Sequence, residues 1–356
     1  MRIVILADPV DNQRAGIHTY TKCLIEALLK IDQKNEYIFI HKKKNEFFNG
    51  LSHHVVPRKA YPGYDTLRRF FILPRLIKRL KPDIVWEPCH IGPFRLPKSI
   101  KKIVTVHDLT PILFPKFHIF RSVLIHKLFF RKTLKNADLI LTPSENTKKD
   151  IKKYLSNEKN IEVTPLAIDQ PKTNPPRLET TPGPYILYLG TLEPRKNLEL
   201  LIEAFLELKK SENLPHKLVL AGEIGWKSDK VVKAAQNEHI VLTNYVTENE
   251  RASLYAHCDL FVYPSLYEGF GLPPLEAMSY GKQVVCSNGG SLKEIFSNHA
   301  LLFSPTNKTE LKSSIQTAIT APPITPEKLQ EFAKKFTWEK TATKTLAAIN
   351  KLLPLL

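Results

Sequence analysis

Short apolar runs alternate with amphipathic stretches along the whole chain. The runs span residues 3–6, 37–40, 84–86, 103–106 and 139–141 in the first half, and 186–189, 218–221, 260–263 and 284–286 in the second. One stretch between them, 197–208, places its apolar residues at the period of an α-helix: Leu198, Leu201, Ile202, Phe205 and Leu208. Continuous apolar strands that alternate with helices predict parallel sheets covered on both faces, the α/β class.

A proline-rich segment divides the chain into two halves of similar size. Residues 165–184 hold six prolines, and proline lacks the amide donor that a helix interior or a central strand needs. A length of 356 residues also exceeds one ordinary hydrophobic core. We therefore expect two doubly wound, Rossmann-like domains, 1–170 and 185–335, which a linker at 171–184 joins and which face each other across a cleft. Ligands bind such sheets at the carboxyl ends of the strands.

The composition is that of a soluble globular protein, because 43% of the residues are hydrophobic and 24% are charged. This balance excludes a disordered chain, a collagen and a small disulfide-stabilised protein. The four cysteines are too far apart for a Cys-x-x-Cys metal or redox pair, and scattered thiols suit a reducing cytosol. No apolar run approaches the ~20 residues that span a bilayer, and residues 1–8 fit a first strand better than a signal peptide. We expect a cytoplasmic protein.

Positive charge is concentrated in the first half of the chain. Residues 1–170 carry 31 Lys and Arg against 16 Asp and Glu, a balance of +15, whereas residues 171–356 carry 21 against 19, a balance of +2. This asymmetry indicates an anionic partner for the first half, such as nucleic acid, an acidic membrane surface or a phosphorylated substrate. A solvated basic surface without any partner is the simpler alternative.

The segment 263–278 has the features of a ligand-binding loop. An apolar strand ends, two glycines follow, and a proline pair at 273–274 opens a helix. Gly269 and Gly271 permit tight turns and close approach to a ligand. The free amides near the helix start, which can donate to a phosphate or a sugar hydroxyl, are those of Phe270, Gly271 and Leu272.

Two carboxylates bracket this loop, Glu268 before it and Glu276 in what we expect to be the first helical turn. Carboxylates accept hydrogen bonds from the vicinal hydroxyls of a sugar or a ribose. Taken singly, Glu276 is as well explained as a favourable charge at a helix N-terminus, and Glu268 as a solvated loop acid. Together, around a Gly-x-Gly loop that follows a strand, they indicate a binding site.

A second loop, 190–197, joins a strand to the amphipathic helix of the second half. It begins with Gly190 and Thr191 and ends with two adjacent cations, Arg195 and Lys196. Cations before a helix N-terminus oppose the helix dipole unless an anion is bound there. A guanidinium and an ammonium together suit two phosphates, so the loop indicates a diphosphate site. An exposed basic loop is the alternative.

The first half offers two weaker candidates. Gly16 lies in the loop that we expect after the first strand, and His107 follows the strand at 103–106. A lone histidine is more often structural, but the carboxyl edge of a strand is where catalytic groups are found. The chain has no Gly-x-Gly-x-x-Gly, which counts against a nicotinamide dehydrogenase, and it has no triad, zinc motif or P-loop.

These motifs resemble family 4 of the retaining glycosyltransferases, which have the GT-B fold. Two segments carry the resemblance in order, Gly-Thr-Leu-Glu-Pro-Arg-Lys-Asn at 190–197 and Glu-Gly-Phe-Gly-Leu-Pro-Pro-Leu-Glu-Ala at 268–277, and Val-His-Asp-Leu at 106–109 extends it. The resemblance implies a transferase that takes a sugar from a nucleotide-sugar donor, retains the anomeric configuration and needs no metal ion or other cofactor. The first domain would bind a glycan or lipid-linked acceptor. A last helix within 336–356 would pack back on that domain.

The resemblance also implies a role for each candidate residue. Glu276 would bind the donor ribose, and Glu268 would face hydroxyls of the donor sugar. Backbone amides at 270–272 would contact the sugar and the diphosphate, while Arg195 and Lys196 would neutralise the diphosphate as it leaves. His107 would reach the donor sugar from the first domain, where Gly16 matches the family's loop glycine. Thr191 stands after the strand-ending glycine, where the family often has an arginine.

Breaking a glycosyl phosphate bond without a metal requires cations and helix amides that stabilise the charge on the leaving group. No carboxylate stands out as a nucleophile, so we expect attack on the same face of the sugar as the leaving phosphate. The 190–197 segment is most like bacterial mannosyltransferases of polysaccharide assembly, which makes GDP-mannose the first donor to consider, ahead of UDP-sugars.

The charged first half suggests peripheral binding to the inner face of the membrane. Its basic clusters, Arg68-Arg69, 75–79 and 129–132, are interleaved with apolar residues, although each could be an ordinary amphipathic helix with its polar face in water. A nucleotide-sugar epimerase and a basic nucleic-acid-binding protein are alternatives. The latter is disfavoured because the basic half has no aromatic-rich recognition motif, so we expect no nucleic-acid partner.

Overall fold

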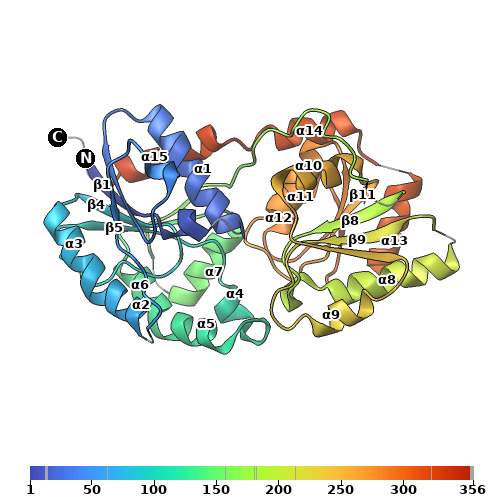
Figure 1. Ribbon diagram of the computed structural model, residues 1–356, viewed down its shortest axis with the longest axis horizontal. Helices are drawn as coiled ribbons and strands as arrows, with labels where there is room; N and C mark the ends of the chain where they lie inside the picture. The colour runs from blue at the N-terminus through green and yellow to red at the C-terminus, as the bar shows by residue number, and fades with distance from the viewer. Residues whose placement is uncertain are drawn as a thin grey trace. The chain divides into compact units, whose positions relative to one another are not determined.

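The computed structural model describes residues 1–12, 15–61, 63–156, 158–179, 181, 183–212, 214–321 and 323–352 (Figure 1). The chain forms two compact units. Unit 1 comprises Met1–Leu113, Phe120–Ala167 and the C-terminal segment from Trp338, and unit 2 comprises Phe114–Ile119 and Ile168–Thr337. None of the helices in these described ranges is long and apolar enough to cross a membrane.

A parallel sheet of seven strands forms the centre of unit 1, in the order β3-β2-β1-β4-β5-β6-β7. The strands are β1 (Arg2–Leu6), β2 (Glu36–His41), β3 (His53–Val55), β4 (Ile84–Glu87), β5 (Lys101–Thr105), β6 (Leu139–Thr142) and β7 (Ile161–Val163). The strand order reverses direction between β1 and β4. Such a switch point leaves a crevice at the carboxyl ends of the two strands.

The helices of unit 1 include two long segments that change type along their length. One runs through α2 (Tyr64–Leu67), the π-helical η3 (Arg68–Ile72) and α3 (Leu73–Leu80), and the other through α5 (Phe120–Ile125), η5 (His126–Phe130) and α6 (Arg131–Asn136). The remaining elements are η1 (Asp8–Asn12), α1 (Ala15–Ile31), η2 (Glu46–Phe48), α4 (Thr110–Leu113), α7 (Glu145–Leu155) and α15 (Trp338–Asn350).

The last helix belongs to unit 1 rather than to the unit that precedes it in sequence. Trp338 of α15 lies 6.4 Å from Tyr20 of α1, ring centre to ring centre. The hydroxyl of Thr341 donates to the carbonyl of Pro165 at 2.7 Å. Apart from the short segment Phe114–Ile119, which belongs to unit 2, the chain therefore crosses from unit 1 to unit 2 at residues 167–168 and returns at 337–338.

Unit 2 is built on a parallel sheet of six strands in the order β10-β9-β8-β11-β12-β13. Its strands are β8 (Tyr185–Leu189), β9 (Lys217–Ala221), β10 (Ile240–Asn244), β11 (Leu260–Tyr263), β12 (Gln283–Ser287) and β13 (Leu301–Phe303). The order reverses between β8 and β11. The loops that follow these two strands are the two loops singled out in the sequence.

The helices of unit 2 are η4 (Pro115–Phe117), η6 (Pro194–Lys196), α8 (Leu198–Ser211), α9 (Asp229–Ala234), α10 (Glu248–His257), α11 (Leu272–Ser279), α12 (Leu292–Phe296), α13 (Lys308–Thr320) and α14 (Pro326–Ala333). All five apolar residues of the periodic pattern at 197–208 are buried in α8. Asn197 has positive φ and precedes the helix.

The predicted class, doubly wound α/β with two Rossmann-like sheets, is confirmed. The sequence pattern missed four strands, β3, β7, β10 and β13, and each of them lies at an edge of its sheet. Edge strands are covered incompletely, so they lack the continuous apolar run of a central strand. β3, for example, reads His-His-Val, and its residues are half-buried or exposed.

Two local expectations were wrong. Gly16 is not in a loop, because α1 begins at Ala15 and places Gly16, exposed, in the first helical turn. Helix α11 begins at Leu272, so Glu276 falls in the second turn rather than the first. Glu276 is therefore beyond the turn in which the helix dipole acts most strongly.

Candidate functional site

The loops after β8 and β11 lie side by side at the switch point of unit 2. The amide of Leu266 donates to the carbonyl of Arg195 at 2.8 Å, and the guanidinium of Arg195 donates to the carbonyl of Tyr267 at 2.8 Å. Two segments about 70 residues apart in sequence therefore form one structure. The resemblance described above implied one diphosphate for both loops, but not these direct contacts between them.

A buried cluster of four charged side chains joins the two loops. Oε1 of Glu268 lies 2.6 Å from Nζ of Lys196 and 2.9 Å from Nη1 of Arg195, and Oε1 of Glu193 lies 2.6 Å from Nη2 of Arg195. The side chains of Arg195, Lys196 and Glu268 are 10 to 12% exposed, and that of Glu193 is 5% exposed. Two positive charges are thus balanced by two negative charges.

The charge state of Glu268 is set by its neighbours. Burial acts to raise the pKa of this carboxyl, but Arg195 and Lys196 outweigh burial and lower the pKa to about 2. Glu268 is therefore ionised at neutral pH. It is neither a solvated loop acid nor a proton donor at that pH.

An aromatic side chain from β11 completes the surroundings of the ammonium. Lys196 donates to the hydroxyl of Tyr263 at 2.6 Å, and its Nζ lies 4.9 Å from the centre of the Tyr263 ring. An ammonium has three N–H donors. Within the described part of the chain, the partners of Lys196 are Tyr263 and Glu268, which leaves one donor for a ligand.

The second carboxylate of the sequence motif belongs to a different set of contacts. Tyr255 of α10 donates to Oε2 of Glu276 at 2.8 Å, and Nη1 of Arg251 lies 3.4 Å from Oε1. Burial raises the pKa of Glu276, and Arg251 and Tyr255 oppose that rise. Arg251 and Tyr255 were not expected from the sequence. An arginine and a tyrosine one helical turn apart look the same in sequence whether or not they contact a carboxylate.

The glycines of the two loops are required by close contacts. Gly271 has φ of +107°, and a Cβ there would lie 2.7 Å from Leu292 and 2.9 Å from Phe296. Gly190 has φ of +151°, and a Cβ there would lie 2.9 Å from the hydroxyl of Tyr188. Tyr188 donates to the carbonyl of Thr191 at 3.1 Å, which fixes the start of the loop.

The start of α11 presents unused donors. Among the described residues, no acceptor forms a hydrogen bond with the amides of Phe270, Gly271 or Leu272. The side chain of Phe270 is buried against Phe336, at 5.8 Å between ring centres, and so holds the loop backbone in place. These amides, at a helix N-terminus, can donate to an anion or to a hydroxyl. Gly269 belongs to the same turn.

His107 and Gly16 belong to unit 1. Nε2 of His107 lies 3.0 Å from the carbonyl of Pro88. Since a carbonyl only accepts, Nε2 carries the proton and Nδ1 is an acceptor. The ring packs edge-on against Tyr20, with centres 4.7 Å apart. Burial lowers the pKa of His107, so its imidazole is neutral at pH 7.

Two family descriptions match the chain and cover its two halves. "Glycosyltransferase Family 4" matches residues 15–170, and "Glycosyl transferases group 1" matches residues 169–336.

Curated mannosyltransferases match this chain over 62 to 99% of its length. The O-antigen chain mannosyltransferase B of Escherichia coli is 33% identical and covers 99% of this chain and 100% of its own length. The O-antigen chain mannosyltransferase RfbU of Salmonella typhimurium is 27% identical over 62% of each chain.

Solved structures share the fold at low sequence identity. The sucrose-phosphate synthase of Thermosynechococcus elongatus superposes with a TM-score of 0.76 over 99% of both chains, at 18% identity. The Anabaena protein Alr3699/HepE, in complex with UDP and glucose, superposes with a TM-score of 0.72 over 99% of this chain and 100% of its own, at 15% identity.

The charged cluster predicts a specific loss of stability. Replacing Glu268 by Gln leaves two buried cations with one carboxylate, and we expect the free energy of unfolding at pH 7 to fall by about 3 kcal/mol. The folded-state pKa of Glu268 lies below the ordinary value of 4.5. The contribution of Glu268 to the free energy of unfolding is therefore present above pH 4.5 and is lost as the pH falls toward 2. Urea unfolding at several pH values measures both effects, and the difference between the two proteins should narrow in acid.

Glu248→Gln is the matched control, because the Glu248 side chain is 72% exposed and lies 3.5 Å from Lys172. Exposed pairs of this kind contribute at most about 1 kcal/mol. A Glu268→Gln protein that unfolds at the same urea concentration as the control would show that the cluster does not stabilise the fold.

Proposed function

Because the chain belongs to glycosyltransferase family 4 and is an enzyme that transfers sugars, we propose that it moves mannose from GDP-mannose to a glycan or lipid-linked acceptor in the synthesis of a cell-surface polysaccharide. Transfer proceeds with retention of the anomeric configuration and without a metal ion. The names of the Escherichia coli and Salmonella relatives support mannose as the sugar and O-antigen as the kind of product.

The observation that carries this proposal is the buried pair of cations at the switch point of unit 2. A nucleoside diphosphate leaving group gains negative charge as the glycosyl bond breaks. Preorganised cations in a site of low dielectric stabilise such charge more than water does. Arg195 and Lys196 are held in place by Glu193 and Glu268 before any ligand arrives. The remaining donor of Lys196 takes a phosphate oxygen.

The other groups of this switch point contact different parts of the donor. The amides at 270–272 donate to the diphosphate and to sugar hydroxyls, next to the loop of Gly190 and Thr191. Glu276, oriented by Tyr255, accepts hydrogen bonds from the ribose. Glu268 keeps Lys196 charged and faces the hydroxyls of the transferred sugar. His107 of unit 1, neutral and with Nδ1 as an acceptor, contacts the donor sugar, and Gly16 belongs to the same substrate-facing edge of unit 1.

The chemical step follows from the absence of a suitable nucleophile in the cluster. Glu268 is engaged with two cations, which reduces its ability to attack an anomeric carbon. The acceptor hydroxyl therefore attacks on the face that the diphosphate leaves. The bond from the anomeric carbon to the phosphate oxygen breaks, the bond to the acceptor oxygen forms, and the acceptor proton passes to the leaving phosphate. Closure of the site excludes water, which would otherwise compete as an acceptor.

We also propose that unit 1 binds the acceptor and rests on an anionic membrane at its cytoplasmic face. The surface concerned is not the Arg68-Arg69 cluster, because Arg68 is 3% exposed and is paired with Asp8 at 2.6 Å. Nor is it formed by residues 129–130, since Phe130 is buried and Phe129 packs on the core.

The membrane-facing surface is the outer face of the helical segment 120–136. Three large apolar side chains, four residues apart, are exposed there: Phe120 by 80%, Leu124 by 43% and Leu128 by 60%. The same segment contains five basic residues, all exposed, and no acidic residue: Arg121, Lys127, Arg131, Lys132 and Lys135. An apolar stripe flanked by cations alone complements an anionic bilayer surface.

The donor is tested by calorimetric titration with a chelator present. We expect GDP-mannose to bind and UDP-glucose, UDP-galactose and UDP-N-acetylglucosamine to bind more weakly. Glu276→Ala removes hydrogen bonds to the ribose and should weaken GDP-mannose binding about tenfold. Glu248→Ala should leave it unchanged. Binding of a UDP-sugar alone would overturn the choice of donor, and binding only after a metal is added would overturn metal independence.

The stereochemistry is tested on the product of a reaction with GDP-mannose and acceptor-bearing membrane extract. Nuclear magnetic resonance should show that the new glycosidic bond has the anomeric configuration of the donor. A covalent glycosyl-enzyme trapped at an acidic residue would contradict same-face attack, and release of an isomerised free sugar would indicate an epimerase.

Membrane binding is tested by flotation with vesicles of phosphatidylglycerol and phosphatidylcholine. The unaltered protein should float with anionic vesicles at low salt, and the triple variant Phe120→Ser, Leu124→Ser, Leu128→Ser should not. Tyr245→Ser removes an apolar side chain of 61% exposure from unit 2 and serves as the control. Equal flotation of the triple variant and the control would refute the assignment of this surface.

A further inference from the structure

His107 is held by the loop that follows β4. Its ring donates from Nε2 to the carbonyl of Pro88 at 3.0 Å, and its backbone amide donates to Nε2 of His90 at 3.3 Å. Strand β4 ends at Glu87, so Pro88 and His90 both stand directly after it in the chain. No sequence motif pointed to His90.

His90 supplies an acceptor where a neighbouring strand no longer provides one. Beyond the end of β5, the amide of Val106 donates to the carbonyl of Leu141 in β6 at 2.9 Å. The next amide, that of His107, donates toward the β4 side, where the strand has already ended. Backbone amides are rarely left without an acceptor, and here the imidazole of His90 replaces a strand carbonyl. The amide of His90 also donates to the carbonyl of Thr105 at 3.0 Å.

The backbone of His90 is strained. Its φ is +55°, in the left-handed region that residues with a Cβ seldom adopt. Across it, the amide of Ile91 donates to the carbonyl of Cys89 at 2.6 Å. A hydrogen bond of this kind around a residue of positive φ forms the rarer, strained type of γ-turn. Glycine would adopt this turn without strain, so a histidine at this position indicates that its side chain is needed.

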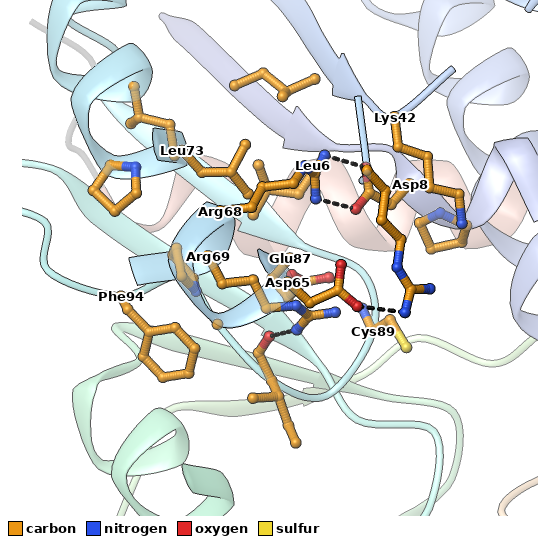
Figure 2. A pocket seen from close by; sticks show the side chains of 18 of the residues that line it. Leu6, Asp8, Lys42, Asp65, Arg68, Arg69, Leu73, Glu87, Cys89 and Phe94 are labelled. Atoms are coloured by element: carbon orange, nitrogen blue, oxygen red, sulfur yellow. Dashed lines mark hydrogen bonds and ion pairs between the residues drawn. The ribbon is translucent and has the colours of Figure 1, made fainter. Parts of the chain in front are cut away.

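The strained turn is anchored on both sides of His90. Oε1 of Glu87 accepts from the amide of Cys89 at 3.1 Å, and Arg69 donates from Nη1 to the carbonyl of Ile91 at 3.0 Å (Figure 2). The side chain of His90 is itself buried, with 9% exposure. The imidazole of His90 therefore has a fixed position.

Two rings of unit 1 enclose the ring of His107. His90 stacks on it with ring centres 5.7 Å apart and planes inclined by 28°, and Tyr20 packs edge-on at 4.7 Å. Because Nε2 of His90 accepts from an amide, that nitrogen carries no proton. An imidazolium has no acceptor, so His90 is neutral and carries its proton on Nδ1.

We propose that His90 is a positioning residue for the sugar transfer, which fixes the backbone and the ring of His107 so that Nδ1 of His107 meets a hydroxyl of the transferred sugar. The inference rests on the proposed function, in which His107 contacts the donor sugar. His90 acts on the reaction only through His107. Displacing a contacting group by a small distance slows the reaction even where substrate binding is unaffected.

The hydrogen bond between His90 and His107 is tested without any substrate. In the full-length protein with isotope-labelled histidine, long-range proton–nitrogen correlation spectra show which ring nitrogen carries the proton, and His90→Gln and His107→Gln assign the signals. At pH 7, His90 should carry its proton on Nδ1, and His107 should carry its proton on Nε2. A proton on Nε2 of His90 would overturn the proposal, because that nitrogen could not accept from the His107 amide.

Two substitutions separate the acceptor nitrogen of His90 from its ring. His90→Phe keeps a ring without the acceptor, and His90→Gln places Oε1 near the position of Nε2. With GDP-mannose and acceptor-bearing membrane extract, His90→Phe should lower kcat about tenfold and change KM for GDP-mannose by less than about twofold, because unit 2 binds the donor. His90→Gln should recover part of kcat. If His90→Phe does not fold, His90→Asn takes its place, since Asn tolerates the left-handed turn and is too short to reach the amide.

His54→Phe is the matched control, because His54 is a half-buried histidine on β3, at the edge of the same sheet. It should leave kcat and KM unchanged. A kcat of His90→Phe equal to that of this control would overturn the proposal.

A double variant tests whether His90 acts through His107. His107→Ala should lower kcat, and adding His90→Phe should lower it no further, because the group that His90 positions is gone. A separate structural role of His90 would lower kcat by the same factor in both backgrounds and would overturn the proposal. Failure of the unaltered protein to bind GDP-mannose would count against the proposed donor alone. The spectra need no donor, and kcat is then compared with the sugar nucleotide that does bind.

Discussion

Two cations can remain charged inside unit 2 only because two carboxylates stand against them. An isolated ion taken out of water costs several kcal/mol, and an ion pair recovers that cost only when its geometry is good. The contacts of 2.6 to 2.9 Å among Glu193, Arg195, Lys196 and Glu268 meet this condition. They also tie the loop after β8 to the loop after β11. The shape of the switch point in unit 2 therefore depends on electrostatic balance as much as on apolar packing.

The equal number of cations and carboxylates in this cluster affects how it would bind an anion. The cluster has no net charge, so the diphosphate that we propose as its ligand would not meet a site of unsatisfied positive charge. It would meet donors already oriented, and little reorganisation would be needed when charge develops on it. The surrounding packing supports the same geometry, because Asn197 donates to the carbonyls of Pro264 and Pro305 at 3.2 and 2.8 Å and so fixes the start of α8.

The central strands and the periodic helix could be predicted because burial on both faces leaves a continuous apolar run. The four edge strands could not, since one side of each is only partly covered and its sequence is mixed. Both site loops could be predicted, because each contains glycines and charged residues that the strand before it and the helix after it do not need. The family resemblance implied that both loops bind one donor, but the contacts between the loops could not be predicted, because no local pattern reports which loops a sheet order brings together.

The neighbours of a residue were harder to predict than its position. That Glu268 faces hydroxyls of the donor sugar stays a prediction, and the structure adds Lys196 and Arg195 as neighbours of its Oε1. Glu276 was placed in the first turn of its helix. It lies in the second turn, where its neighbours are Tyr255 and Arg251 of α10. Partners of this kind come from helices that are remote in sequence. The orientation of a carboxylate is therefore a tertiary property.

Glutamates at the two switch points of the chain stand in different electrostatic surroundings. Release of a charged leaving group requires cations that stay charged, and in unit 2 each cation has a carboxylate beside it. In unit 1, Glu87 at the end of β4 accepts from the amide of Cys89 at 3.1 Å, and burial raises the pKa of its carboxyl to about 8 because, among the described residues, no cation forms an ion pair with it. The same side chain, glutamate, thus serves as a fixed counter-ion at one sheet edge and as a neutral hydrogen-bonding group at the other. What differs is whether a cation lies within contact of its oxygens.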